Sequence, residues 1–367
     1  MDINTKIDTS KSLDSNLRIS DIDLPLYRYG LTHQIDINNY FNEYNQIKKL
    51  KIKSYLIVLF FVLHILKYIM CIKYVRNGRV PNILLDVLQF LGGIPVYMYM
   101  AGMLFSFLNA MIIRLFNKVS NVELKWILII EVLKGIKPIN CIKIKNDDIL
   151  KKFISHIKSL HIITRFFVIS IISFAGLAVI FFTAYFYNLQ DFIIYGIISI
   201  IFLIIWVFFT FKILYYSFEY FYIICYYCKI RVKCLCNQMV LNSEKLFLNY
   251  KSIDEIIREH NKICQSIFEY NIFWKNYYCL LIYTFIPLNA IYLHQILFES
   301  LPIFVLIACI LAFISLFCFQ IFTNLMTASI SKEITKSYKY INNFYMKYSH
   351  VINIKRKIKV IISYNLL

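Results

Sequence analysis

Residues 192–228 read FIIYGIISIIFLIIWVFFTFKILYYSFEYFYIICYYC, an almost unbroken apolar and aromatic stretch of 37 residues. A helix needs about 20 apolar residues to cross roughly 30 Å of hydrocarbon. At about 1.5 Å per residue, this stretch would form a helix about 55 Å long. The sequence therefore predicts a membrane-spanning helix whose C-terminal half continues well beyond the bilayer.

Five further segments are long and apolar enough to span a bilayer: 55–75, 84–115, 166–187, 277–298 and 303–326. The second contains Gly92, Gly93 and Pro95, which we expect to kink the helix, because neighbouring helices can satisfy the freed backbone groups. A mean hydropathy of +0.61 and 59% hydrophobic residues exceed the roughly 45–50% of soluble proteins. The expected fold is an all-α, polytopic membrane bundle with six transmembrane helices.

The basic residues predict which way the bundle faces. Four blocks, residues 1–53, 114–165, 229–275 and 332–359, hold 35 of the 40 Lys and Arg residues, and apolar segments separate them. Because cytoplasmic loops retain Lys and Arg, all four blocks and the N-terminus are expected in the cytosol of a multi-pass plasma-membrane protein. The net charge of +19 is then explained by topology and by attraction to the lipid bilayer, and no nucleic-acid partner is predicted.

The chain divides into a cytoplasmic tail (1–53), a six-span domain (54–326) and an amphipathic, basic C-terminal region (327–367). The outer connections 188–191 and 299–302 are short, whereas the inner loops 117–165 and 229–276 are long. Apolar residues recur there at helical spacing, so we expect helices that continue below the membrane. The residues of this pattern are Ile253, Ile256, His260, Ile263 and Ile267 in the second loop, and Ile330, Ile334, Tyr338, Ile341 and Tyr345 in the C-terminal region.

This topology resembles that of the arthropod gustatory and odorant receptor superfamily. Three stretches are similar to short segments of that family. They are LPLYRYG (24–30) before the first span, EHNKIC (259–264) leading to NIFW (271–274) before the fifth, and TASISKEIT (327–335) after the sixth.

The resemblance implies a gustatory-type chemosensory receptor: a homo- or hetero-tetrameric, ligand-gated, non-selective cation channel that binds a small molecule in the outer half of its bundle. Members of the family are similar to one another mainly in a seventh span, with Thr-Tyr, apolar residues and a Gln, which lines the pore. No such segment occurs in this sequence. Either a final segment that holds the seventh helix is missing from this sequence, in which case the tetramer is expected, or the protein has six spans and would not form the family's pore. A six-span transporter or a non-conducting accessory membrane protein is therefore the alternative.

A set of polar and aromatic residues is predicted at the outer ends of the spans. Ionisable residues within spans are costly and usually face a cavity or a partner, which makes Asp86 and His294 the most informative. The resemblance implies that this region is the ligand pocket, whereas an aromatic belt at the membrane interface is the structural alternative. The candidate ligand-binding residues are Asp86, Gln89, Tyr185, Tyr195, Asn289, Tyr292, His294 and Gln295, with Tyr187 beside them.

Four cysteines lie near the inner end of the fourth span: Cys225, Cys228, Cys234 and Cys236. Their spacing is poor for zinc, and cysteines beside Lys and Arg favour either S-palmitoylation or buried, inert thiols. Lys67 and Lys212 lie inside apolar stretches, where snorkelling to an interface is expected ahead of an ion pathway.

Enzyme chemistry finds little support in the sequence. The seven histidines show no ligand spacing, and eight glycines provide no phosphate-binding loop. We predict no enzyme activity, no cofactor and no metal.

Overall fold

The computed structural model describes residues 40–76, 95–119, 147–186, 197–243, 250–301 and 303–347, together with Ile129, Val132 and Ile144. Within these residues the chain is all-helical. Six helices are long and apolar enough to cross a membrane, which confirms the predicted helical class and indicates a multi-pass membrane protein. They are α3 (Tyr40–Arg76), α4 (Pro95–Val119), α6 (Asp147–Phe186), α8 (Ile197–Ser243), α9 (Tyr250–Phe298) and α10 (Ile303–Lys347).

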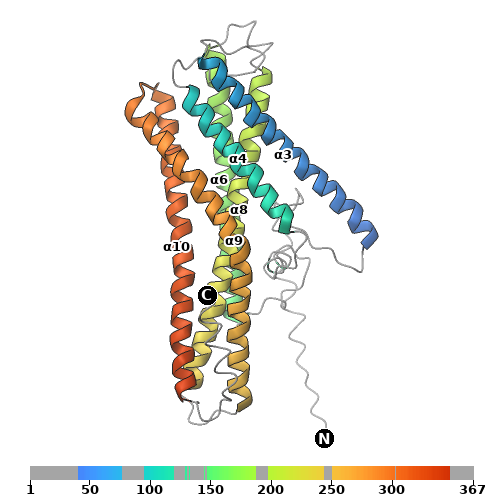
Figure 1. The fold of residues 1–367 in the computed structure, drawn as a ribbon, viewed down its shortest axis with the longest axis vertical. Coiled ribbons are helices and arrows are strands. Elements are labelled where there is room, and N and C mark those ends of the chain that lie inside the picture. Colours follow the sequence, from blue (N-terminus) through green and yellow to red (C-terminus); the bar gives the residue numbers. More distant parts are fainter. Residues whose placement is uncertain are drawn as a thin grey trace.

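Three of these helices are much longer than a bilayer requires. The helices α8, α9 and α10 contain 47, 49 and 45 residues, or about 70 Å of helix each. They continue side by side past the level at which α4 ends (Figure 1). We call this part the three-helix extension, residues 229–243, 250–276 and 327–347. Its existence confirms the prediction that helices continue through the second inner loop.

The three-helix extension has a small core of its own. It is built from Val232, Leu235 and Met239 of α8, Ile256, Ile257 and Ile263 of α9, and Tyr338 and Ile341 of α10. His260 lies buried in the same interior. The predicted apolar faces of α9 and α10 are therefore confirmed where their side chains are described, because Ile256, His260, Ile263, Tyr338 and Ile341 all point inward.

Two boundaries differ from the prediction. The sixth span and the amphipathic C-terminal region form one helix, α10, because no residue between Leu325 and Lys332 breaks the helical backbone. The helix α4 begins at Pro95, where the missing amide hydrogen of proline costs no helical hydrogen bond. Residues 84–94, including Gly92 and Gly93, lie outside the described residues.

The helices α3 and α4 pack against each other at a close approach around Gly102. A Cβ atom at Gly102 would lie 2.7 Å from the ring of Tyr68. The Tyr68 ring also lies 6.1 Å from the ring of Tyr99 on α4 and 6.2 Å from the ring of Trp206 on α8. Trp206 donates a hydrogen bond to Ser106, and Ser106 in turn donates to the carbonyl of Gly102. An aromatic cluster thus joins three helices at the one position where a glycine permits the contact.

Candidate functional site

Four of the predicted ligand-binding residues lie on consecutive turns of α9, close to the hairpin that joins it to α10. We call Asn289, Tyr292, His294 and Gln295 the hairpin-end set. Pro287 lies just before them, and α9 continues through this proline without interruption. Tyr292 and Gln295 are buried, with Gln295 completely inaccessible, while Asn289 and His294 are partly buried.

Neighbouring helices supply the partners of this set. The His294 ring lies 4.7 Å from the ring of Tyr97 on α4 and 5.2 Å from the ring of Phe298. Asn289 donates to the side-chain oxygen of Gln320 at 3.5 Å, and the Cys309 thiol donates to Gln295 at 3.6 Å. The hairpin-end set therefore lies where α4, α9 and α10 meet.

Each of the three nitrogen-bearing side chains in the set also has a polar atom without a partner. Asn289 Oδ1, His294 Nδ1 and Gln295 Nε2 are out of contact with solvent and find no hydrogen-bond partner among the described residues. An unsatisfied buried polar atom costs roughly 1–3 kcal/mol, so three within seven residues call for an explanation. The arrangement offers one acceptor, one amide donor and an imidazole nitrogen to a small polar molecule beside aromatic rings.

The other predicted members of the pocket are not placed with this set. Asp86, Gln89, Tyr187 and Tyr195 lie outside the described residues. Tyr185 belongs to the last turn of α6, and its side chain is likewise outside the description. Tyr97, which the sequence analysis missed, is the neighbour that the structure adds. The signal that the sequence offered for Tyr97 was its position two residues after Pro95, the first residue of α4.

A second group of polar contacts joins the helices farther along the bundle, at a level we call the waist. Ser54 of α3 and Asn117 of α4 exchange hydrogen bonds at 3.3 and 3.1 Å. Three further contacts join the remaining helices in pairs: Ser217–Tyr277 (2.8 Å), Tyr278–Asn324 and His161–Glu219 (2.9 Å). The Phe116 ring, next to Asn117, packs edge-on against Tyr220 and Tyr277, which ties these contacts together.

The His161–Glu219 contact was missed because its two residues are 58 positions apart in the chain. Glu219 stands in the stretch that the sequence analysis treated as uniformly apolar. Its side chain is completely buried, and that of His161 is 10% exposed. The second Glu219 oxygen, Oε2, finds no hydrogen-bond partner within the part of the chain that the structure describes.

The four cysteines of the fourth span extend from the waist into the three-helix extension. Cys225, Cys228 and Cys236 are buried, and Cys234 is partly buried. Burial raises the pKa of the Cys236 thiol to about 11, with nearby Glu333 adding to the effect. These surroundings favour the inert-thiol interpretation for three of the four and leave Cys234 as the candidate for acylation.

The two lysines within the apolar stretches are both partly buried. The Lys212 ammonium lies 4.6 Å from the centre of the Phe208 ring, a cation–π contact within α8.

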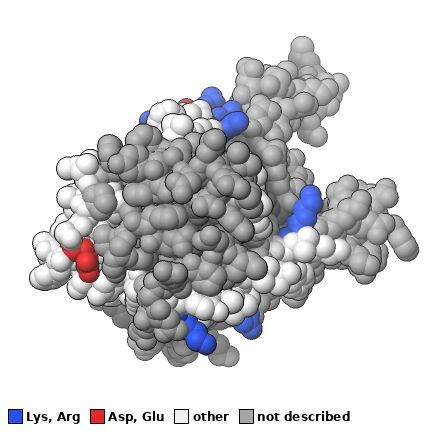
Figure 2. Space-filling model, turned by 90° about the horizontal axis from the view of Figure 1, so that it is seen from above, with Lys and Arg blue, Asp and Glu red and all other residues white. Residues whose placement is uncertain are grey.

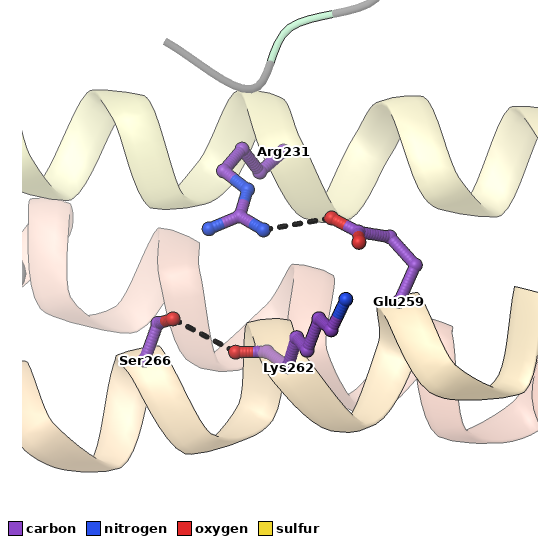
Figure 3. Close-up of polar contacts among 4 residues, drawn as sticks. All are labelled: Arg231, Glu259, Lys262 and Ser266. Atoms are coloured by element: carbon purple, nitrogen blue, oxygen red, sulfur yellow. Dashed lines mark hydrogen bonds and ion pairs between the residues drawn. The ribbon is translucent and has the colours of Figure 1, made fainter. Parts of the chain in front are cut away.

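The three-helix extension contains one well-buried charge. Arg231 of α8 is 6% exposed and donates through Nη2 to Glu259 of α9 at 2.9 Å (Figure 3). Its guanidinium also faces the Tyr227 ring at 5.7 Å. One turn farther along α9, Ser266 donates to the carbonyl of Lys262. The Arg231–Glu259 pair thus fixes the register of α8 against α9.

His260 follows Glu259 on α9 and contacts α10. Its ring lies 5.5 Å from that of Tyr338, and both of its ring nitrogens lie 3.8 Å from the Cys264 sulfur. Burial lowers the pKa of His260 to about 4, although the nearby Asn261 side chain opposes this. Within the described residues no three His, Cys, Asp or Glu side chains gather as a metal site would require.

Comparison with known proteins gives no further identification. No family model, no curated protein and no solved structure matches this chain. The family resemblance therefore remains a prediction from local sequence and topology.

Proposed function

We propose that this chain is a chemosensory receptor subunit of the gustatory type, which binds a small polar molecule at the hairpin-end set. The observation that carries the proposal is the trio of unpartnered, buried polar atoms on Asn289, His294 and Gln295. A fully packed structural helix would satisfy these atoms internally or replace them with apolar groups. A ligand that accepts from Gln295 and donates to Asn289 would satisfy them, with Tyr97 and His294 supplying an aromatic wall.

The three-helix extension supports the receptor class. Helices that are longer than a bilayer requires are one of the features on which the topological resemblance was based, and α8, α9 and α10 all have this length. In that family a seventh helix lines the channel. The proposal therefore includes conduction of ions by a tetramer, which would be tested once ligand binding has been measured.

Binding can be tested without knowing whether the chain conducts. The full chain, purified in detergent, would be heated with a panel of sugars, amino acids and alkaloids while tryptophan fluorescence follows unfolding. At least one compound is expected to raise the unfolding temperature with a saturable dose dependence, because a ligand that binds only the folded state stabilises it. Gln295→Ala and His294→Ala should each raise, by tenfold or more, the ligand concentration that gives half of the maximal shift.

Leu297→Ala is the matched control, because Leu297 lies on the same turn and is 62% exposed. A shift that Leu297→Ala removes as fully as Gln295→Ala would argue against a pocket at this position. Ligand-evoked currents in cells expressing the chain would then distinguish a channel subunit from a receptor-like accessory protein. Ligand uptake without current would favour the transporter alternative.

A further inference from the structure

The His161–Glu219 pair at the waist has no part in the proposed ligand site, and its chemistry is unusual for its surroundings. Glu219 is completely buried between α6 and α8, and its hydrogen-bond partner is the Nδ1 atom of His161 at 2.9 Å. The ring of Tyr216 lies 6.1 Å from the imidazole. An ionisable residue at such a position in a membrane protein marks a functional site more often than a packing feature.

The second oxygen of Glu219 provides an independent observation. Oε2 is buried and without a hydrogen-bond partner among the described residues, so the carboxyl group is half-satisfied. Burying a net charge is far more costly than burying a neutral pair. The pair is neutral when it holds one proton, either on the imidazole facing a carboxylate or on the carboxyl group facing a neutral imidazole.

Each helix that packs near the pair contributes neighbouring side chains, some of which titrate. On the α6 side His156, one turn away, is exposed and hydrogen-bonded to Tyr222 of α8 at 2.7 Å. The helices α4 and α10 reach this level with Phe116 and Phe322, which do not titrate, and α9 reaches it with Tyr277, which is bonded to Ser217. Nearby titratable or charged side chains on the two helices of the pair are Lys158, Arg165 and Lys212, besides Tyr216 and Tyr222.

We propose that His161 and Glu219 form a proton-binding site that links α6 to α8 and holds one proton in the folded protein. The two helices are then held together most firmly when that proton is present. Its loss leaves a buried anion between them. Because Glu219 lies within a turn of Ser217, which is bonded to Tyr277, a change at the pair acts on the contact between α8 and α9.

The test is the pH dependence of unfolding by SDS in mixed micelles, followed by tryptophan fluorescence of the full chain. Above about pH 6.5 both groups are deprotonated in the unfolded chain, whereas the folded pair keeps one proton. Folding then binds a proton, and the unfolding equilibrium constant should rise about tenfold per pH unit between about pH 7 and 8.5. Glu219→Gln removes the carboxyl group that shares the proton, so this part of the pH dependence should be lost.

Other groups that titrate in this range, the buried cysteines included, contribute equally to both chains and cancel in the comparison. Asp254→Asn, which removes a carboxylate from the surface of α9, is the control and should keep the wild-type slope. If Glu219→Gln does not fold, the double variant His161→Gln, Glu219→Gln provides a neutral pair of similar reach for the same measurement. Equal slopes for the wild type and the neutral variant would overturn the proposal.

Discussion

The helix α10 passes through two different surroundings, and comparing its two halves teaches where the bilayer lies. Between Ile303 and Leu325 most exposed residues are apolar, with Ile303 at 65% and Leu325 at 62% exposure, and the polar exceptions are Ser315 and Asn324. Between Ser331 and Lys339 the exposed residues are Ser331, Lys332, Thr335, Lys336 and Lys339. Only the first half is suited to hydrocarbon, and the change between the halves occurs next to the waist contact of Tyr278 with Asn324.

The helix α6 changes character near the same level. On α6, Ile162, Ile163 and Phe166 are exposed above His161, with Arg165 among them, whereas Lys151, Lys152 and Ser155 are exposed below it. Viewed along the long axis from the hairpin end, the Lys and Arg side chains that are visible lie at the rim of the outline (Figure 2). The waist is thus the expected boundary of the membrane on the side of the three-helix extension, an inference from exposed surface that does not use the count of basic residues.

The largest expected effect is an all-or-none difference in chemical labelling across this boundary. Ser331→Cys should react with a membrane-impermeant maleimide added to the cytosolic face of sealed vesicles, while Leu325→Cys should not, because hydrocarbon excludes the reagent. Gel-shift counting of added label against the parent chain, whose native cysteines set the background, measures this. Labelling of Ser331→Cys from the opposite face would show that the predicted orientation is inverted.

The next effect concerns the buried charge of the three-helix extension. Glu259→Ala leaves Arg231 buried without its partner and should reduce the free energy of unfolding by about 3 kcal/mol. The pair Arg258–Asp254, whose arginine is 65% exposed, offers the contrast, since Arg258→Ala should cost less than about 1 kcal/mol. SDS titration of the purified chain compares the two. Equal losses would mean that Arg231 is solvated and that the extension has no dry interior.

The stability of the protein at acid pH tests the same interior, because His260 is buried there. In the folded chain His260 stays neutral down to about pH 4, whereas in the unfolded chain it is protonated below about pH 6.5. Its contribution to stability is therefore present above pH 6.5 and is lost as the pH falls toward 4, by up to roughly 3 kcal/mol. His260→Leu should flatten the acid side of the stability profile. A curve for His260→Leu that runs parallel to that of the wild type would contradict the assignment.

Much of the architecture was predictable because helical periodicity and hydropathy are local signals. Ile256, His260 and Ile263 were expected on one buried face and are found there. The excess length of α8 followed from the length of residues 192–228, and the continuation of α9 and α10 followed from apolar residues at helical spacing. What could not be predicted depends on which helices become neighbours. The approach of Tyr97 to His294 joins α4 to α9, and that of His161 to Glu219 joins α6 to α8.

The candidate pocket also shows that contacts between helices could not be predicted from the sequence. Asn289, Tyr292, His294 and Gln295 were chosen for their depth in the fifth span, and their depth did not reveal which atoms would be satisfied. Gln295 became informative only when Cys309 was found to occupy its oxygen and leave its nitrogen without a partner. Sequence can therefore nominate polar residues in a span, whereas their roles depend on packing between helices.

The smallest expected effect concerns Gly102, where a glycine permits α3 and α4 to approach each other in the part of the bundle expected within the membrane. Gly102→Ala would place a methyl group 2.7 Å from the Tyr68 ring, and the ring cannot withdraw freely because Tyr99 and Trp206 pack against it. Overpacking of this kind should cost about 1–3 kcal/mol of unfolding free energy. Gly176→Ala is the matched control, since a Cβ there meets nothing within 4 Å and alanine favours helix by up to about 1 kcal/mol. If both substitutions stabilise the protein equally in SDS titrations, then α3 is free to move away from α4, and the aromatic cluster does not hold these helices together.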